Sequence, residues 1–421
     1  MRKPKAKGDR GSWEPGTPVE QNACYWSDEP AVIPRTAKIP AGALTVVDLF
    51  CGCGGFSVGF ELAGFHSLIG ADIHPPSVAT FARNHPTASM IVGDMRRVKD
   101  ETIIEAAGGH RVDVVAAGVP CQGFSLNNRK RHDKDDRNFL FREFIRIMNL
   151  FSPSVVLLEN VSGLASSANG AFKESICHAI EESGYRVDCE MLNALDYGVP
   201  QKRRRLFFLG VRPGVKLRWL KPTHGPGRAN PIVTVWDAIG DLPQVGPGEM
   251  ADQYDKDPFT DYQRFMRKSC RTELHNHEAP NHPSETIEKI GATIPGKPIY
   301  PKFPQRIRLN SDAPSPTQVS GGIRPQYQFG HPKSPRGLTI RERCRLQSFP
   351  DRYFICGGIV QGRVQTGNAV PPLLAKAVAH EIKAMLRGEP PSKDSVPPKK
   401  WSGRLDSNQR PLGPENGTDY Q

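Results

Sequence analysis

The chain has 421 residues, more than one simple compact domain usually holds, so two domains are expected. Its net charge of +12 predicts a protein that binds a polyanion, with nucleic acid the first candidate. The alternative is a basic protein whose charge serves only solubility. The basic N-terminus lacks the apolar core of a signal peptide, and no apolar run approaches the roughly 18 residues of a membrane span. The nine cysteines are scattered, which fits reduced thiols. These features argue against a secreted or membrane protein and predict a cytoplasmic one.

The first 43 residues are polar, rich in glycine and proline and without apolar periodicity, and a flexible extension is expected there. A strand over 44–49 is predicted next, followed by a turn containing Gly52, Gly54 and Gly55 and then a helix. This order opens nucleotide-binding α/β units, because glycine lets the backbone approach a ligand and a helix N-terminus offers free N–H groups. The spacing departs from the strict dinucleotide fingerprint, so a nucleotide is indicated without a specific cofactor.

Acidic residues mark three successive predicted strands, at Asp48, Asp72 and Asp94. Asp72 stands about 20 residues after the glycine turn, where such folds bind a ribose hydroxyl. We expect Asp72 and Asp94 to contact a ligand. The alternative is helix N-capping, which aspartate also favours.

An apolar run over 114–119 leads into Pro120 and Cys121 and predicts a buried strand that feeds a tight loop. Ligands bind at the carboxyl ends of strands in open α/β sheets, so Cys121 is a candidate nucleophile. The alternative is a small thiol buried as a hydrophobe. Cys51 and Cys53 have no second pair at matching spacing, so no metal site is predicted.

An apolar stripe predicts a helix over 139–151, and a buried strand over 154–158 ends directly before Glu159. Burial raises the pKa of a carboxyl group, so Glu159 is a candidate donor of a proton or hydrogen bond to a substrate ring. An exposed carboxylate at a strand end is the alternative. A helix over 172–183 and a strand over 186–193 are predicted next.

Three consecutive arginines then run into an apolar strand. Because alternate strand residues share a face, Arg203 and Arg205 are predicted to point together toward a phosphate or a base edge. Residues 216–335 hold 17 of the 39 prolines and little periodicity, which predicts a separate, loop-rich domain. Aromatic and basic side chains alternate there over 262–271 and 302–308, as nucleic-acid surfaces often do.

Regular structure is predicted to return in a hinge segment, 336–360, where Thr339 and Glu342 have the spacing of a capping box. A last helix carries an apolar stripe and is expected to pack back onto the first sheet, so that 361–388 completes the catalytic domain of 44–215.

The tail, 389–421, is expected to be disordered. Its segment Leu405–Gln409 back-translates through GAT-TCG-AAC, the complement of the sequence common to tRNA T-arms. We hypothesise that the reading frame runs into a tRNA gene on the opposite strand, which would leave the tail without a selected function.

Taken in order, these motifs resemble those of the cytosine carbon-5 DNA methyltransferases. The resemblance covers 44–215 and 335–388 and rests on seven segments: 48–56, 118–125, 136–138, 159–161, 201–205, 341–351 and 367–370. It implies an α/β fold with a Rossmann-like methyltransferase sheet, and a smaller target-recognition domain at 216–335. It also implies S-adenosylmethionine as cofactor and double-stranded DNA as substrate.

Site roles follow from the same resemblance. Cys121 would add to carbon 6 of a flipped-out cytosine, Glu159 would engage ring nitrogen 3, and carbon 5 would take the methyl group. Arg203 and Arg205 would hold the target nucleotide. The residues implied in the cofactor site are Asp48, Phe50, Gly52, Cys53, Gly54, Gly55, Asp72, Ile73, Asp94, Met95, Gly118, Pro120, Asn368 and Val370. Those implied in DNA contact are Gln122, Ser125, Asn160 and Gln201.

Three rival interpretations share part of the pattern. The tRNA-methylating branch of the family has the same motifs but also a Cys-Phe-Thr tripeptide, which this sequence lacks. A Rossmann-type dehydrogenase would account for Asp72 but not for Cys121 and Glu159 together. A catalytically dead DNA-binding module would have lost Cys121 or Glu159. A separate restriction endonuclease commonly accompanies the family, and a monomer is expected.

Overall fold

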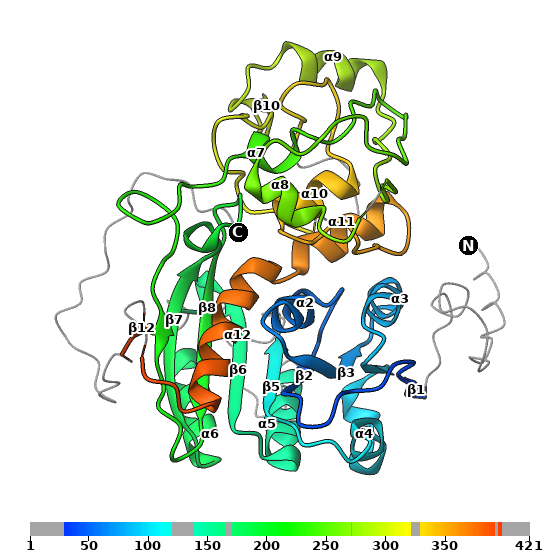
Figure 1. Ribbon diagram of the computed structural model, residues 1–421. Helices are drawn as coiled ribbons and strands as arrows, with labels where there is room; N and C mark the ends of the chain where they lie inside the picture. The colour runs from blue at the N-terminus through cyan, green and yellow to red at the C-terminus, as the bar shows by residue number, and fades with distance from the viewer. Residues whose placement is uncertain are drawn as a thin grey trace, which may run out of the picture.

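The computed structural model describes residues 29–119, 139–165, 171–270, 272–320, 329–391 and 395–397. Figure 1 shows two lobes, one built around a large sheet and one made of short helices and loops. Within the described part of the chain, no helix has the length and apolar character needed to cross a membrane.

An eight-stranded sheet forms the centre of the larger lobe, in the order β1-β4-β3-β2-β5-β6-β8-β7. The strands are β1 Ala31–Ile33, β2 Thr45–Leu49, β3 His66–Asp72, β4 Ser89–Val92, β5 Val114–Gly118, β6 Val155–Val161, β7 Arg186–Asn193 and β8 Arg204–Val211. Strands β4, β3, β2, β5 and β6 run parallel, while β1, β8 and β7 each run antiparallel to a neighbour. The predicted Rossmann-like sheet is confirmed, and its order reverses between β2 and β5, where ligands bind in such sheets.

Helices cover both faces of this sheet (Figure 1). They are α2 Gly55–Leu62, α3 Pro75–Asn84, α4 Asp100–Ala107, α5 Phe139–Phe151, α6 Ala171–Glu182 and α12 Pro372–Leu386. Single turns of 3-10 helix lie at η1 Met95–Arg97, η4 Ser162–Ala165 and η6 Ala194–Tyr197. The last long helix, α12, packs on α2 and the sheet, as the sequence predicted.

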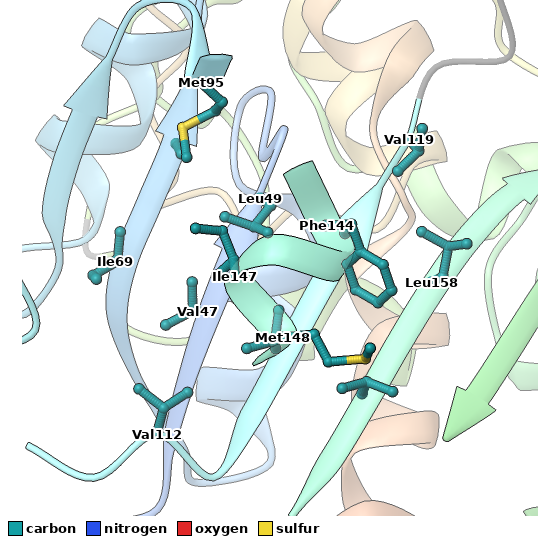
Figure 2. Packing of buried hydrophobic residues seen from close by; sticks show 14 of the residues in the cluster. Val47, Leu49, Ile69, Met95, Val112, Val119, Phe144, Ile147, Met148 and Leu158 are labelled. Atoms are coloured by element: carbon teal, nitrogen blue, oxygen red, sulfur yellow. The ribbon is translucent and has the colours of Figure 1, made fainter. Parts of the chain in front are cut away.

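Each central strand sends alternate side chains into two hydrophobic cores. Val47 and Leu49 of β2 join the core beneath α4, α5 and α6, while Val46 joins the core beneath α2 and α12. Figure 2 shows the first core, where Phe144 and Ile147 of α5 lie over the sheet. With both faces covered, the carboxyl edge of the parallel strands is left as the place for a site.

The second lobe is built from short elements joined by long loops. They are α7 Val235–Ile239, α8 Asp261–Met266, α9 Ser284–Ala292, β10 Pro298–Tyr300, β11 Phe303–Ile307, α10 Ile340–Leu346 and α11 Ile359–Asn368. Helix α10 begins with the predicted capping box of Thr339 and Glu342. It sends Leu346 into the core of the second lobe and Cys344 into a cluster with Cys53 of the first lobe. The segment around α10 therefore packs against both lobes.

Three boundaries differ from the sequence-based expectation. Strand β6 continues to Val161, so Glu159 and Asn160 lie within the strand and not after it. In the tail expected to be disordered, Ser395–Val396 forms β12 and pairs with β9, Trp219–Leu220. In the extension expected to be flexible, Ala31–Ile33 forms β1 and pairs with β4. Backbone pairing, with β8, β9 and β4 respectively, extends the regular structure beyond the apolar pattern in these three cases.

Candidate active site

The glycine turn lies at the carboxyl end of β2 and is held to the end of β3. The backbone N–H of Gly52 donates to Asp72 Oδ2 at 2.8 Å, and the other carboxylate oxygen accepts from His74 N at 2.8 Å. Gly52 and Gly54 have φ of 53° and 82°, which glycine adopts without strain. Phe50 has φ of 56°, a strained conformation for a residue with a side chain, and such strain clusters at functional sites.

Close backbone contact explains the glycine at the start of α2. A Cβ on Gly55 would lie 2.1 Å from the carbonyl oxygen of Val370, so only glycine fits. This contact brings Val370, two residues beyond the end of α11, against the glycine turn. Asn368, the last residue of α11, is exposed. Gly55 and Val370 are thus in contact although they lie more than 300 residues apart in sequence.

Two other predicted cofactor residues stand beside this turn, at the end of β3. Burial raises the pKa of Asp72, against the effect of the two backbone N–H groups that hold its carboxylate. Ile73 follows it and is 43% exposed, so an apolar surface lies beside this carboxylate. An oriented carboxylate can bind the hydroxyls of a nucleoside sugar, and an exposed apolar side chain beside it can contact the flat base.

The side chains of four residues predicted for the cofactor site have partners within the protein. Asp48 is fully buried, and its Oδ2 accepts from Ser57 N at 3.1 Å and Ser57 Oγ at 2.8 Å, because α2 folds back over the end of β2. Asp94 caps η1 and pairs with Arg96, which is the N-capping alternative. Two further side chains, those of Met95 and Cys53, are buried in hydrophobic clusters.

Glu159 is the buried acid of the site. Its Oε1 lies 2.9 Å from Nε of Arg205, on the neighbouring strand β8. Burial raises the pKa of Glu159, and the charges of Arg205 and then Arg203 oppose that rise. In the β5–β6 register Glu159 pairs with Gly118, where a Cβ would lie 3.8 Å from Oε2. The absence of a side chain at Gly118 leaves the carboxyl open toward the end of β5.

Asn160, predicted to contact DNA, instead ties β6 to the end of β5. Its Nδ2 donates to the carbonyl of Val119 at 3.2 Å, and the residue is 1% exposed. The backbone that leaves β5 is therefore fixed beside Glu159. Cys121 follows Val119 by two residues but lies outside the described residues, as do Pro120, Gln122 and Ser125.

Arg203 and Gln201 are buried and hold the two lobes together. Arg203 donates from Nη1 to the carbonyl of Gln318 at 2.8 Å and from Nη2 to the carbonyl of Gly367 at 3.1 Å. Gln201 accepts from Gln318 N at 2.9 Å and donates to the carbonyl of Leu346 at 3.0 Å. Both side chains are buried, whereas the predicted phosphate contact of Arg203 and DNA contact of Gln201 need accessible side chains.

The sequence analysis did not identify one residue at this edge, Tyr353. The hydroxyl of Tyr353 donates to the carbonyl of Cys53 in the glycine turn at 2.5 Å. Tyr353 lies two residues beyond the motif that ends at Asp351, and no local pattern marks it. Within the described residues, no group of three or more His, Cys, Asp or Glu side chains is arranged to hold a metal ion.

A family model for C-5 cytosine-specific DNA methylases matches residues 44–384. The chain belongs to this family. The DNA cytosine-5 methyltransferase is 35% identical over 359 residues to the Type II methyltransferase M1.HphI of Haemophilus parahaemolyticus, covering 82% of this chain and 88% of the relative. It is 33% identical over 430 residues to M.AgeI of Thalassovita gelatinovora, covering 82% of this chain and 100% of that relative.

Solved structures agree with this assignment. A candidate DNA modification methyltransferase encoded within an E. coli prophage superposes on the methyltransferase with a TM-score of 0.68 at 26% identity, over 82% of this chain and 100% of that one. The S. pombe Dnmt2 methyltransferase superposes with a TM-score of 0.53 at 17% identity, over 82% and 99%, which supports the fold alone.

Proposed function

We propose that the chain methylates carbon 5 of a cytosine within a specific short sequence of double-stranded DNA, through a covalent adduct with Cys121. The observation that carries this proposal is the buried Glu159 carboxyl, which faces Gly118 and is paired with Arg205. A carboxyl held there can engage a base brought to the end of β5. Cys121 follows Val119 by two residues in the sequence, and the carbonyl of Val119 is bonded to Asn160, the residue after Glu159.

The residues at the glycine turn fit S-adenosylmethionine as cofactor. A Cβ on Gly52 would have no neighbour within 4 Å, so the turn presents bare backbone. Asp72 offers a fixed carboxylate for ribose hydroxyls, and the exposed Ile73 offers an apolar surface for the adenine ring. Bound S-adenosylmethionine supplies the methyl group that carbon 5 takes.

The protein's own groups carry the rest of the reaction. The Cys121 thiolate forms a bond to carbon 6, and the electron pair of the 5,6 double bond moves onto carbon 5. Glu159 donates a hydrogen bond or proton at ring nitrogen 3, which stabilises this electron-rich ring. After methylation a base removes the carbon 5 proton, the bond from carbon 6 to sulfur breaks, and the double bond and thiolate are restored.

A cytosine stacked in duplex DNA cannot reach a carboxyl that is buried beside β5. We therefore infer that the target base swings out of the helix, which costs a few kcal/mol that contacts to the base and backbone must offset. Arg205 is the arginine placed to meet that base, because its guanidinium already pairs with Glu159. The Type II names of the relatives favour a separate restriction endonuclease as companion in a restriction–modification pair.

Bisulfite sequencing of plasmid DNA from a methylation-free host that expresses the chain tests the proposal. We expect protected cytosines in one recurring short sequence, and none when Cys121→Ser is expressed. The purified variant should still bind S-adenosylmethionine. Full protection by Cys121→Ser would overturn the covalent mechanism. No protection by a soluble wild-type protein would overturn the DNA substrate, and tRNA would then be tested.

A further inference from the structure

The glycine turn is held from the second lobe by the side chain of Tyr353. Its hydroxyl donates to the carbonyl of Cys53 at 2.5 Å, across 300 residues of sequence. Tyr353 is fully buried, and it shares a hydrophobic cluster with Cys53, Val58 and Phe349. The hydroxyl is thus the polar end of an otherwise apolar contact, and it fixes one backbone carbonyl of the turn.

His85 and Glu61 orient that hydroxyl. His85 Nε2 lies 2.9 Å from Tyr353 Oη, and Nδ1 lies 2.7 Å from Glu61 Oε1. Because the hydroxyl hydrogen goes to Cys53, the Tyr353 oxygen must accept from Nε2, and Nδ1 donates to the Glu61 carboxylate. Burial would raise the pKa of Glu61, but the charge and hydrogen bond of His85 lower it. His85 therefore donates from both ring nitrogens, to Glu61 of α2 on one side and to Tyr353 on the other, and Tyr353 donates onward to the turn.

The turn itself is packed against both supporting side chains. A Cβ on Gly54 would lie 2.5 Å from His85 Nε2 and 2.7 Å from Tyr353 Oη. The backbone at Gly54 therefore rests on the imidazole and the phenol, and a shift of either group would move the turn.

The second lobe also fixes the backbone of Tyr353. Arg341 donates to the carbonyl of Tyr353 at 2.8 Å. Asp351, two residues earlier, accepts from Nε and Nη2 of Arg345, both at 2.6 Å, and from the hydroxyl of Tyr254 at 2.6 Å. Tyr254 belongs to the predicted target-recognition domain. Hydrogen bonds thus connect that domain to the glycine turn through Asp351 and Tyr353.

We propose that Tyr353 is a positioning residue that holds the glycine turn in the shape that binds S-adenosylmethionine. The inference rests on the proposed function, since it takes this turn as the cofactor site. Tyr353 touches neither the carboxyl of Glu159 nor the end of β5, so its hydroxyl acts on cofactor affinity and not on the chemical step. Its loss changes the KM for S-adenosylmethionine and leaves kcat and the KM for DNA in place.

Tyr353→Phe in the full chain tests this, because it removes the hydroxyl and keeps the ring in its cluster. We expect the Kd and the KM for S-adenosylmethionine to rise about fivefold or more, the effect of one buried hydrogen bond, with kcat within about twofold. Tyr185→Phe is the matched control. Its buried hydroxyl also donates to a carbonyl, that of Pro153 at 2.8 Å, at the opposite end of the sheet. Glu61→Gln, a milder change on a partly exposed side chain, should give a smaller rise and serves if Tyr353→Phe does not fold.

The outcomes separate the inference from the function on which it rests. Weaker cofactor binding in Tyr353→Phe but not in Tyr185→Phe supports the inference. Equal cofactor binding by wild type and Tyr353→Phe, or equal weakening in both phenylalanine variants, overturns it and leaves the proposed function standing. A folded wild-type chain that does not bind S-adenosylmethionine overturns the proposed cofactor and the inference with it.

Discussion

Glu159 and Arg205 form an ion pair across the antiparallel strands β6 and β8, with 2.9 Å between Oε1 and Nε. Arg205 lies opposite Val161 in the register, so its guanidinium reaches diagonally to a carboxyl two residues back on the same face. The two side chains are 13% and 11% exposed for Arg205 and Glu159. Arg205 therefore acts on how readily Glu159 is protonated, and the pair can be tested from either partner.

Glu159→Gln should lower kcat by about 100-fold or more, the usual worth of a positioned acid or base. The amide keeps the size of the side chain and can donate a hydrogen bond, but it cannot give up a proton. Binding of DNA and of S-adenosylmethionine should stay within about threefold. Single-turnover methyl transfer, with separate binding measurements, checks the prediction.

Glu381→Gln provides the control for that loss. Glu381 on α12 pairs with Arg218, and both side chains are as buried as those of Glu159 and Arg205. This substitution breaks a buried pair of the same chemistry on the opposite face of the sheet from α5. An equal fall in kcat in Glu381→Gln would mean that damage to the fold, and not loss of a catalytic acid, explains the result at Glu159.

Arg205→Met should shift the pH dependence of methyl transfer. Arg205 opposes the burial that raises the pKa of Glu159, so its removal raises that pKa further. A reaction that needs protonated Glu159 slows as the pH rises through this pKa. The alkaline limb of the kcat profile should therefore move to higher pH in Arg205→Met, even though the maximal rate falls. Arg204→Met, at the exposed neighbour, should leave the limb in place. A limb that moves to lower pH would contradict the assignment of Glu159 as the acid.

Asp48→Asn should change how stability depends on pH. Burial raises the pKa of Asp48 to about 7 in the folded protein, whereas an unfolded aspartate titrates near about 4. The folded protein then keeps a proton that the unfolded chain has lost, so the stability contributed by Asp48 is full below about pH 4 and is lost as the pH rises toward its folded pKa. The Tm of Asp48→Asn minus that of wild type should therefore increase across this interval.

Asp94→Asn is the control for the Asp48 experiment. The hydrogen bond from Arg96 is the largest cause that lowers the pKa of Asp94, so this carboxylate is ionised in both states above about pH 5. Its Tm difference from wild type should not change between about pH 5 and 8. A difference that is equally flat for Asp48→Asn would show that Asp48 does not carry a proton in the folded protein.

The main elements and the buried position of Glu159 could be predicted from local sequence, while the partners of several side chains could not. Continuous apolar runs predicted the parallel strands, because both faces of these strands are buried. Apolar residues at helical spacing predicted the helices α5 and α12, because each buries one face. The same reasoning found Glu159. It assigned Arg203, with Arg205, to a phosphate or a base edge because alternate residues of a strand share a face. Its actual acceptors are carbonyls 115 and 164 residues away, which no spacing records.

Gln201 illustrates this difference and can be tested directly. Its amide bridges Leu346 and Gln347 of the second lobe and Gln318 of the loop that follows β11. Gln201→Ala would leave these buried groups without partners, which should lower the free energy of unfolding by about 1–3 kcal/mol.

The same variant distinguishes a buried bridge from a DNA contact. A bridge between lobes predicts that Gln201→Ala lowers the Tm in the absence of DNA and reduces kcat through misplacement of the second lobe. A contact to a DNA base or phosphate predicts weaker DNA binding at unchanged Tm. Denaturant unfolding and DNA titration of one preparation give both quantities. Because Gln201 carries no charge, the dependence of DNA affinity on salt should be the same in the two proteins. Unchanged stability with weaker DNA binding would return Gln201 to the DNA interface. The loss of stability expected here would place Gln201 in the contact between the two lobes.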